Sequence, residues 1–97
     1  MARPPIYCAD GFAMSVQDHG YAYATPGQTS EIGYPTKEEP LLEGYAEDPT
    51  DPTDTIYANV PNEIVEEIIK KHGGEIPFNE YSDLYRSGGK SYKEDRI

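Results

Sequence analysis

The sequence predicts a single α+β domain, in which a small antiparallel sheet of four or five strands carries one C-terminal helix packed on a face. Three observations lead to this prediction. Short segments that alternate between apolar and small or polar side chains recur between turn residues up to residue 60. An amphipathic segment at 61–72 ends in two glycines. A chain of 97 residues has room for one domain with a modest core.

The clearest strand prediction is residues 12–17, where Phe12, Met14 and Val16 alternate with smaller or polar side chains. The dipeptide Asp10-Gly11 just before it is a strong signal for a two-residue hairpin turn. Further strands are expected at 5–8, 21–25, 31–34 and 55–60.

The helix at 61–72 has a favourable charge distribution, with glutamates near its start and lysines near its end. Either Pro61 takes the first helical position or Asn62 acts as the N-cap. The expected buried stripe consists of Ile64, Val65, Ile68 and Ile69.

Residues 36–55 are expected to form a long loop, in which one helical turn could form at 38–45. The near-repeat Asp48-Pro-Thr50 and Asp51-Pro-Thr53 should hold this backbone extended or turned. Asp48, Asp51 and Asp54 have no evident structural partner in the sequence.

We expect residues 1–78 to form the single α+β domain and residues 79–97 to form a C-terminal extension. In this extension a short helix at 79–86 would be followed by a mobile tail. The segment Ile76–Phe78 could pack against the sheet.

The acidic residues are concentrated in one segment. Residues 31–67 contain eleven carboxylates and one cation, Lys37, so this segment alone carries −10, which equals the net charge of the whole protein. A small domain with such a segment is suited to a basic protein partner. The same acidic balance argues against direct binding to nucleic acid or to an anionic membrane.

The predicted partner-binding site combines these carboxylates with tyrosines that can serve as rigid anchors. It consists of Glu38, Glu39, Glu43, Tyr45, Glu47, Asp48, Asp51, Asp54, Tyr57, Glu63, Glu66 and Glu67. The alternative is that the acidic segment only keeps a small protein soluble and monomeric.

No catalytic constellation is apparent, and we expect no enzyme activity, cofactor or dedicated metal site. Cys8 lies on an apolar strand and is expected to be a buried structural thiol rather than a nucleophile paired with His19 or His72. His72 is explained by its place at a helix C-terminus, and His19 by a solvated turn. The acidic loop lacks the ligand spacing of an EF-hand.

The protein is expected in a reducing cytoplasm. It has one cysteine, no apolar run of the roughly 20 residues that a membrane span needs, and no apolar stretch after its Met-Ala-Arg-Pro-Pro start.

Several short stretches resemble a group of small, uncharacterised proteins of tailed bacteriophages and prophages. The N-terminal run Cys8-Ala-Asp-Gly-Phe-Ala-Met-Ser-Val-Gln17 is similar to a Cys-Ala-Asp-Gly-Phe-x-Met-Ser-Val-Gln motif in that group. The stretches 32–35, 39–42, 45–48, 60–61 and 71–74 follow its pattern in the same order. The resemblance covers about residues 6–74 and carries no assigned activity.

The resemblance implies a phage protein acting in the host cytoplasm, and small acidic phage proteins often block a host protein. We therefore expect an anti-CRISPR or other anti-defence inhibitor that acts by steric and electrostatic occlusion of a basic, nucleic-acid-binding surface. One alternative is an oligomeric sponge for a nucleotide signal, for which Arg3, Lys70, Lys71 and Arg86 are the available cations. Another is a minor virion or assembly protein.

Overall fold

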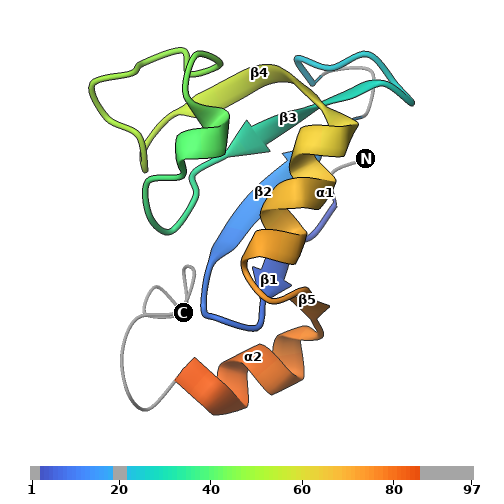
Figure 1. Cartoon of the computed structure of the whole chain (residues 1–97), viewed down its shortest axis with the longest axis vertical. Helices are drawn as coiled ribbons and strands as arrows, with labels where there is room; N and C mark the ends of the chain where they lie inside the picture. Colours follow the sequence, from blue (N-terminus) through green and yellow to red (C-terminus); the bar gives the residue numbers. More distant parts are fainter. Residues whose placement is uncertain (1–2, 19–21, 86–97) are drawn as a thin grey trace.

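The computed structural model describes residues 3–18 and 22–85 of the chain (Figure 1). Its elements in chain order are β1 (Ile6–Cys8), β2 (Ala13–Gln17), β3 (Thr29–Gly33), the 3-10 helix η1 (Pro40–Leu42), β4 (Ile56–Pro61), α1 (Asn62–Lys71), β5 (Glu75–Ile76) and α2 (Phe78–Tyr85).

The five strands form one antiparallel sheet in the order β4-β3-β2-β1-β5. Sheet and helices together make an α+β fold, which confirms the predicted fold class. The first four strands correspond to four of the predicted segments, and β5 arises where Ile76–Phe78 was expected only to pack against the sheet.

The predicted strand at 21–25 is wrong for its described part. Residues 22–24 form a bend, Tyr23 is exposed, and the chain enters the sheet only at Thr29, after a turn closed by a bond from the Gln28 N–H to the Thr25 carbonyl. Aromatic and small residues alternate here, but Pro26-Gly27 follows immediately, and the bond from the Asn59 N–H of β4 to the Tyr23 carbonyl at 2.9 Å is not extended into a strand pairing. Tyr21 and His19 lie outside the described residues.

The β1–β2 hairpin turns at Asp10-Gly11 as predicted, but not through a two-residue turn: the Gly11 N–H bonds to the Cys8 carbonyl, so Ala9 and Asp10 are the central residues of the turn. Ile6 pairs with Met14 and Tyr7 with Ala13, and the Cys8 N–H donates to the Phe12 carbonyl at 2.8 Å. Gly11 has φ +99°, a backbone conformation that residues with a side chain rarely adopt. A Cβ at this position would also come within 3.1 Å of the Tyr85 ring. Both constraints favour glycine at this turn.

The main core lies on one face of the sheet, between β2, β3 and β4 and the covering layer. Leu42 of η1 and Val65 and Ile68 of α1 belong to one buried cluster with residues of those strands. Ile64 and Ile69 are partly buried against the same cluster, so the predicted apolar stripe of the helix is confirmed. Because they share this core, η1 and α1 cover the same face of the sheet (Figure 1).

The second helix covers part of the opposite face. Tyr81 of α2 is fully buried against Ala13, and its ring lies 4.7 Å from that of Tyr7. The Tyr81 hydroxyl donates to the Gly11 carbonyl at 3.0 Å, and the Tyr85 hydroxyl donates to the Ala9 carbonyl. The described part of the predicted C-terminal extension is therefore packed on the β1–β2 hairpin, and the expected tail lies outside the described residues.

The start of α1 differs from both sequence alternatives. Pro61 occupies the N-cap position, and Asn62 is the first helical residue rather than the cap. No side chain caps the helix; the Asn62 carboxamide oxygen instead accepts a hydrogen bond from the Ser30 hydroxyl at 2.6 Å. The helix start is thus joined sideways to β3.

The end of α1 is joined to the β1–β2 hairpin. The backbone N–H of Gly74 bonds to the Ile69 carbonyl, and both Gly73 and Gly74 have φ +93°. From the hairpin, the Ala9 N–H donates to the Gly74 carbonyl and the Asp10 N–H to the His72 carbonyl. These bonds fix the C-terminal end of the helix beside the hairpin turn.

We predict that Ile68→Ala lowers the free energy of unfolding by about 2–4 kcal/mol, because Ile68 is fully buried and its truncation leaves a cavity. Chemical denaturation of the variant provides the measurement. Glu67→Ala, at the neighbouring exposed position, is the control and should change stability by less than about 0.5 kcal/mol. Equal effects of the two substitutions would mean that the helix is not docked through this stripe.

Candidate functional site

The acidic loop, residues 36–55, is folded rather than extended. Its near-repeat forms two successive turns, each with proline at the second position, closed by bonds from the Asp51 N–H to the Asp48 carbonyl and from the Asp54 N–H to the Asp51 carbonyl. The expected helical turn is present as η1, where the Glu39 carboxylate accepts from the Leu41 N–H at 2.9 Å.

The acidic loop is also bonded to β4. The Glu47 N–H donates to the Ile56 carbonyl, and the Ala58 N–H donates to the Tyr45 carbonyl. The Tyr57 hydroxyl donates to the Pro52 carbonyl at 2.5 Å. These bonds hold residues 45–52 alongside the outer edge of the sheet.

Asp48 has a structural role that the sequence did not reveal. Its carboxylate accepts hydrogen bonds from the hydroxyl of Thr50 at 2.6 Å and from the backbone N–H of Thr50 at 3.1 Å. These two donors hold the pKa of Asp48 below its usual value. Asp48 therefore stabilises the first turn, and the expectation that it lacks a structural partner is wrong.

Nine carboxylates of the predicted partner site are exposed on the acidic loop and on α1. They are Glu38, Glu43, Glu47, Asp48, Asp51, Asp54, Glu63, Glu66 and Glu67. We refer to these nine residues as the acidic surface. Glu38 and Glu43 flank η1, which covers the same face of the sheet as α1, whereas the carboxylates of residues 47–54 lie on the turns alongside β4.

The other three residues of the predicted site are not freely exposed. Glu39 is only 3% exposed and Tyr57 also 3%, so neither can serve as a surface contact in this conformation. Tyr45 is half-buried and packs against the main core. The sequence could not separate these residues from the exposed ones, because alternating burial within an irregular loop follows no periodicity.

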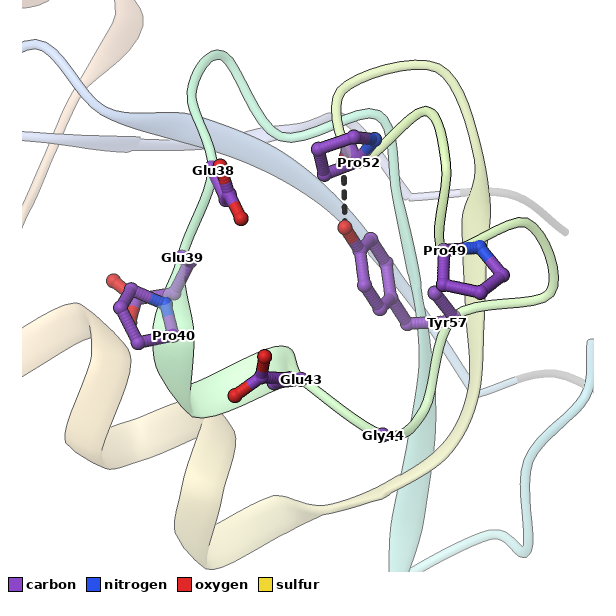
Figure 2. A pocket seen from close by; sticks show the side chains of 9 residues that line it. Glu38, Glu39, Pro40, Glu43, Gly44, Pro49, Pro52 and Tyr57 are labelled. Carbon is purple, nitrogen blue, oxygen red and sulfur yellow. Dashed lines mark hydrogen bonds between the residues drawn. The ribbon is translucent and has the colours of Figure 1, made fainter.

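A hollow of about 270 Å³ opens between η1 and the turns of the acidic loop (Figure 2). Its lining residues are Glu38, Glu39, Pro40, Glu43, Gly44, Ala46, Pro49, Pro52 and Tyr57. Glu38 and Glu43 both lie at its opening, and the Tyr57 ring lies at its side (Figure 2).

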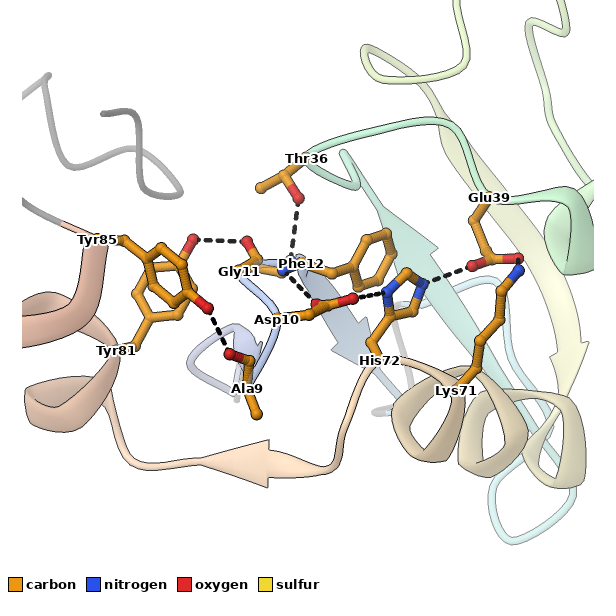
Figure 3. Close-up of polar contacts among 11 residues, drawn as sticks. Ala9, Asp10, Gly11, Phe12, Thr36, Glu39, Lys71, His72, Tyr81 and Tyr85 are labelled. Atoms are coloured by element: carbon orange, nitrogen blue, oxygen red, sulfur yellow. Dashed lines mark hydrogen bonds and ion pairs between the residues drawn. The ribbon is translucent and has the colours of Figure 1, made fainter. Parts of the chain in front are cut away.

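Beneath this layer lies a buried charged cluster centred on His72 (Figure 3). The His72 Nδ1 lies 2.6 Å from the Asp10 carboxylate, and its Nε2 lies 2.6 Å from the Glu39 carboxylate. The second oxygen of Glu39 accepts from the Lys71 ammonium at 2.8 Å. The imidazole also stacks on the Phe12 ring, with 4.1 Å between centroids and 10° between planes.

This geometry determines the hydrogens on the imidazole. A carboxylate only accepts, and a neutral imidazole has one N–H. Hydrogen bonds from His72 to two ionised carboxylates at once therefore require hydrogen on both ring nitrogens. Stacking on the Phe12 ring fixes the plane of the imidazole between the two carboxylates.

The pKa values of both carboxylates lie below their usual values. Burial alone would raise the pKa of Glu39, but the Leu41 N–H, Lys71 and His72 outweigh burial and lower it. Burial also opposes ionisation of Asp10, yet the Phe12 N–H and His72 hold the pKa of Asp10 below its usual value. Both groups are thus held as carboxylates around His72.

The cluster connects three parts of the fold that are distant in sequence. Asp10 belongs to the β1–β2 turn, Glu39 begins η1 in the acidic loop, and His72 follows the last residue of α1. Sequence reasoning attributed His72 to the helix dipole and missed this arrangement. The only available signal was a histidine placed next to a helix-ending glycine.

Cys8 adds no nucleophile to this cluster. Its side chain is fully buried in the main core, as the sequence predicted. Burial, together with the nearby charges of Asp10 and Glu75, raises the pKa of the Cys8 thiol to about 11, so the reactive thiolate is disfavoured.

Two further findings concern residues 3–18 and 22–85. No group of three or more histidine, cysteine, aspartate or glutamate side chains within them is arranged to hold a metal ion. No helix within them is both long and apolar enough to cross a membrane.

In comparisons with family models, curated proteins and solved structures, none matches this chain. The resemblance to the phage proteins therefore stays a prediction, and the candidate site has to be argued from its own residues.

We predict that Glu39→Gln lowers the free energy of unfolding by about 2–4 kcal/mol, because it removes the buried carboxylate that bonds both His72 and Lys71. Urea denaturation at neutral pH measures this loss. Glu38→Gln makes the same chemical change at the adjacent exposed residue and should be nearly neutral. If the two variants are equally stable, the buried cluster contributes nothing to the fold.

We also predict a stability loss in acid. Since Asp10 and Glu39 have lower pKa values in the folded chain than in the unfolded chain, the unfolded chain binds more protons in that range. Their contribution is fully present above about pH 5 and is lost as pH falls below about 4. Urea midpoints across pH should show wild type losing its advantage over Asp10→Asn/Glu39→Gln in this window. A pH-independent difference between the two proteins would contradict the assignment.

Proposed function

We propose that this protein is a non-enzymatic inhibitor of phage origin, which acts in the host cytoplasm by binding a host protein with a basic, nucleic-acid-binding surface and occluding it. An anti-CRISPR or another anti-defence role fits best. The observation that carries the proposal is the acidic surface, in which nine carboxylates are exposed on the acidic loop and on α1.

The order of the acidic loop supports this role. Its two proline turns, its bonds to β4 and the Glu39 ion pairs hold the carboxylates in place before any partner arrives. Binding through a preorganised segment costs less conformational entropy than ordering a flexible loop. A surface that only solubilises the protein has no need for such order.

The nearby cations offset little of this charge. Lys71 is paired with Glu39, and Lys37 and Lys70 are the other exposed lysines next to the acidic surface. A partner would therefore meet a strongly negative potential, which accelerates encounter with a positive surface.

The nucleotide-sponge alternative gains no support from the cations assigned to it. Arg3 is paired with Asp18 at 2.8 Å, and Lys71 with Glu39 at 2.8 Å. Arg86 lies outside the described residues. Two of the four cations assigned to a phosphate-binding pocket are therefore already in ion pairs with carboxylates.

The proposal predicts salt-sensitive binding to a host protein recovered by pull-down. The variant Glu47→Gln/Asp51→Asn/Asp54→Asn, which spares the turn-stabilising Asp48, should slow association on the order of tenfold at low salt. Binding kinetics over a salt series provide the measurement, and the melting temperature should be nearly unchanged.

The matched control is Glu75→Gln/Glu80→Gln/Asp83→Asn, which removes three exposed carboxylates from β5 and α2, outside the acidic surface. It should bind almost as the wild type does. If both triple variants slow association equally, only net charge matters and the acidic surface is not the interface. If affinity is also independent of salt, the surface serves solubility alone.

A further inference from the structure

We propose that the hollow between η1 and the turns of the acidic loop is a receptor for a single arginine side chain of the protein partner. This inference rests on the proposed function and makes it specific, because it names the side chain that the acidic surface would recognise. The argument comes from the lining of the hollow, its size and its charge.

The polar part of the hollow consists of carboxylates. Glu38 and Glu43 are exposed and both line the opening (Figure 2). Within the described part of the chain, neither forms an ion pair, and the carboxylate of Glu39 is already bonded to His72 and Lys71. Two carboxylates at one opening without a cation are complementary to a positive group that enters it.

The remaining lining is apolar and rigid. Pro40, Pro49, Pro52 and Ala46 supply aliphatic surface, and the Tyr57 ring is held by its bond to the Pro52 carbonyl. A long side chain with an apolar stem and a cationic tip suits such a site, because the stem can pack on the prolines while the tip reaches the carboxylates.

Arginine fits this arrangement better than lysine. Its guanidinium presents five donors in a plane and can bond to two carboxylates at once, whereas an ammonium acts as a compact point charge.

The size of the hollow argues against a larger ligand. Its volume of about 270 Å³ falls just below the range of about 300–1,000 Å³ that is typical of small-molecule sites. One side chain delivered by a partner protein is the occupant that both volume and charge favour.

The test uses the whole protein and a capped Gly-Arg-Gly peptide as the probe, followed by ¹H–¹⁵N chemical shifts. We expect the peptide to shift the amides around Glu38, Glu43 and Gly44. Its citrulline counterpart, which has nearly the same shape without the charge, should bind at least tenfold more weakly. No shift at these amides, or equal binding of both peptides, would overturn the proposal.

The variant Glu38→Gln/Glu43→Gln should weaken binding of the arginine peptide on the order of tenfold without changing the melting temperature. The matched control Glu75→Gln/Glu80→Gln removes the same charge from exposed positions of β5 and α2, outside the acidic surface, and should leave binding unchanged. Equal weakening by both variants would mean that the peptide responds only to net charge, which contradicts a specific receptor.

The peptide test and the partner test fail separately. If the peptide does not bind but a host protein still binds with strong salt dependence, the arginine receptor is wrong and the proposed function stands. If the peptide binds in the hollow but partner binding is insensitive to salt and to the acidic-surface variants, the proposed function is wrong.

Discussion

The fold depends on one buried imidazole that is shared between two carboxylates. His72 sits 2.6 Å from both Asp10 and Glu39 while being almost fully buried. A charge in such a place is unfavourable unless every partner is present, since its desolvation must be offset by the surrounding ionic bonds. The three segments that supply these partners are consequently constrained to meet at one point.

This constraint explains how so much acid can be carried by an ordered loop. Residues 36–55 have few apolar anchors, and the exposed carboxylates repel one another. Glu39 provides an attractive contact between the beginning of this loop and the end of α1, and Tyr57 with Thr55 holds the far end of the loop to β4. The negative charges are thereby held on a rigid support, which is what a surface for a basic partner requires.

Local patterns predicted most of the architecture. Alternation and the Asp10-Gly11 turn located the hairpin, and the apolar stripe with Gly73-Gly74 located the helix. The same reasoning was wrong at 22–25, because alternation cannot show whether a neighbouring strand is available for pairing. The sequence also predicted either Pro61 at the first helical position or Asn62 at the N-cap, whereas Pro61 is the N-cap and Asn62 is the first helical residue.

The candidate site was predictable only in part. Composition alone located the acidic surface, since charge density needs no contact information. The burial of Glu39 and Tyr57 follows from tertiary packing. The two partners of His72 are also distant in sequence: Asp10 lies 62 positions from it and Glu39 lies 33 positions from it. No local signal in a single sequence reports such pairings, so a residue attributed to the helix dipole turned out to be the centre of the buried cluster.

The most direct test of this account is a double-mutant cycle between His72 and Glu39. The free energies of unfolding of wild type, His72→Gln, Glu39→Gln and the double variant would be measured by urea denaturation at neutral pH. If the imidazole and the carboxylate stabilise each other as the geometry indicates, the stability lost in the double variant should be smaller than the sum of the two single losses by more than about 1 kcal/mol. Additive losses, within about 0.5 kcal/mol, would contradict the central role of the cluster.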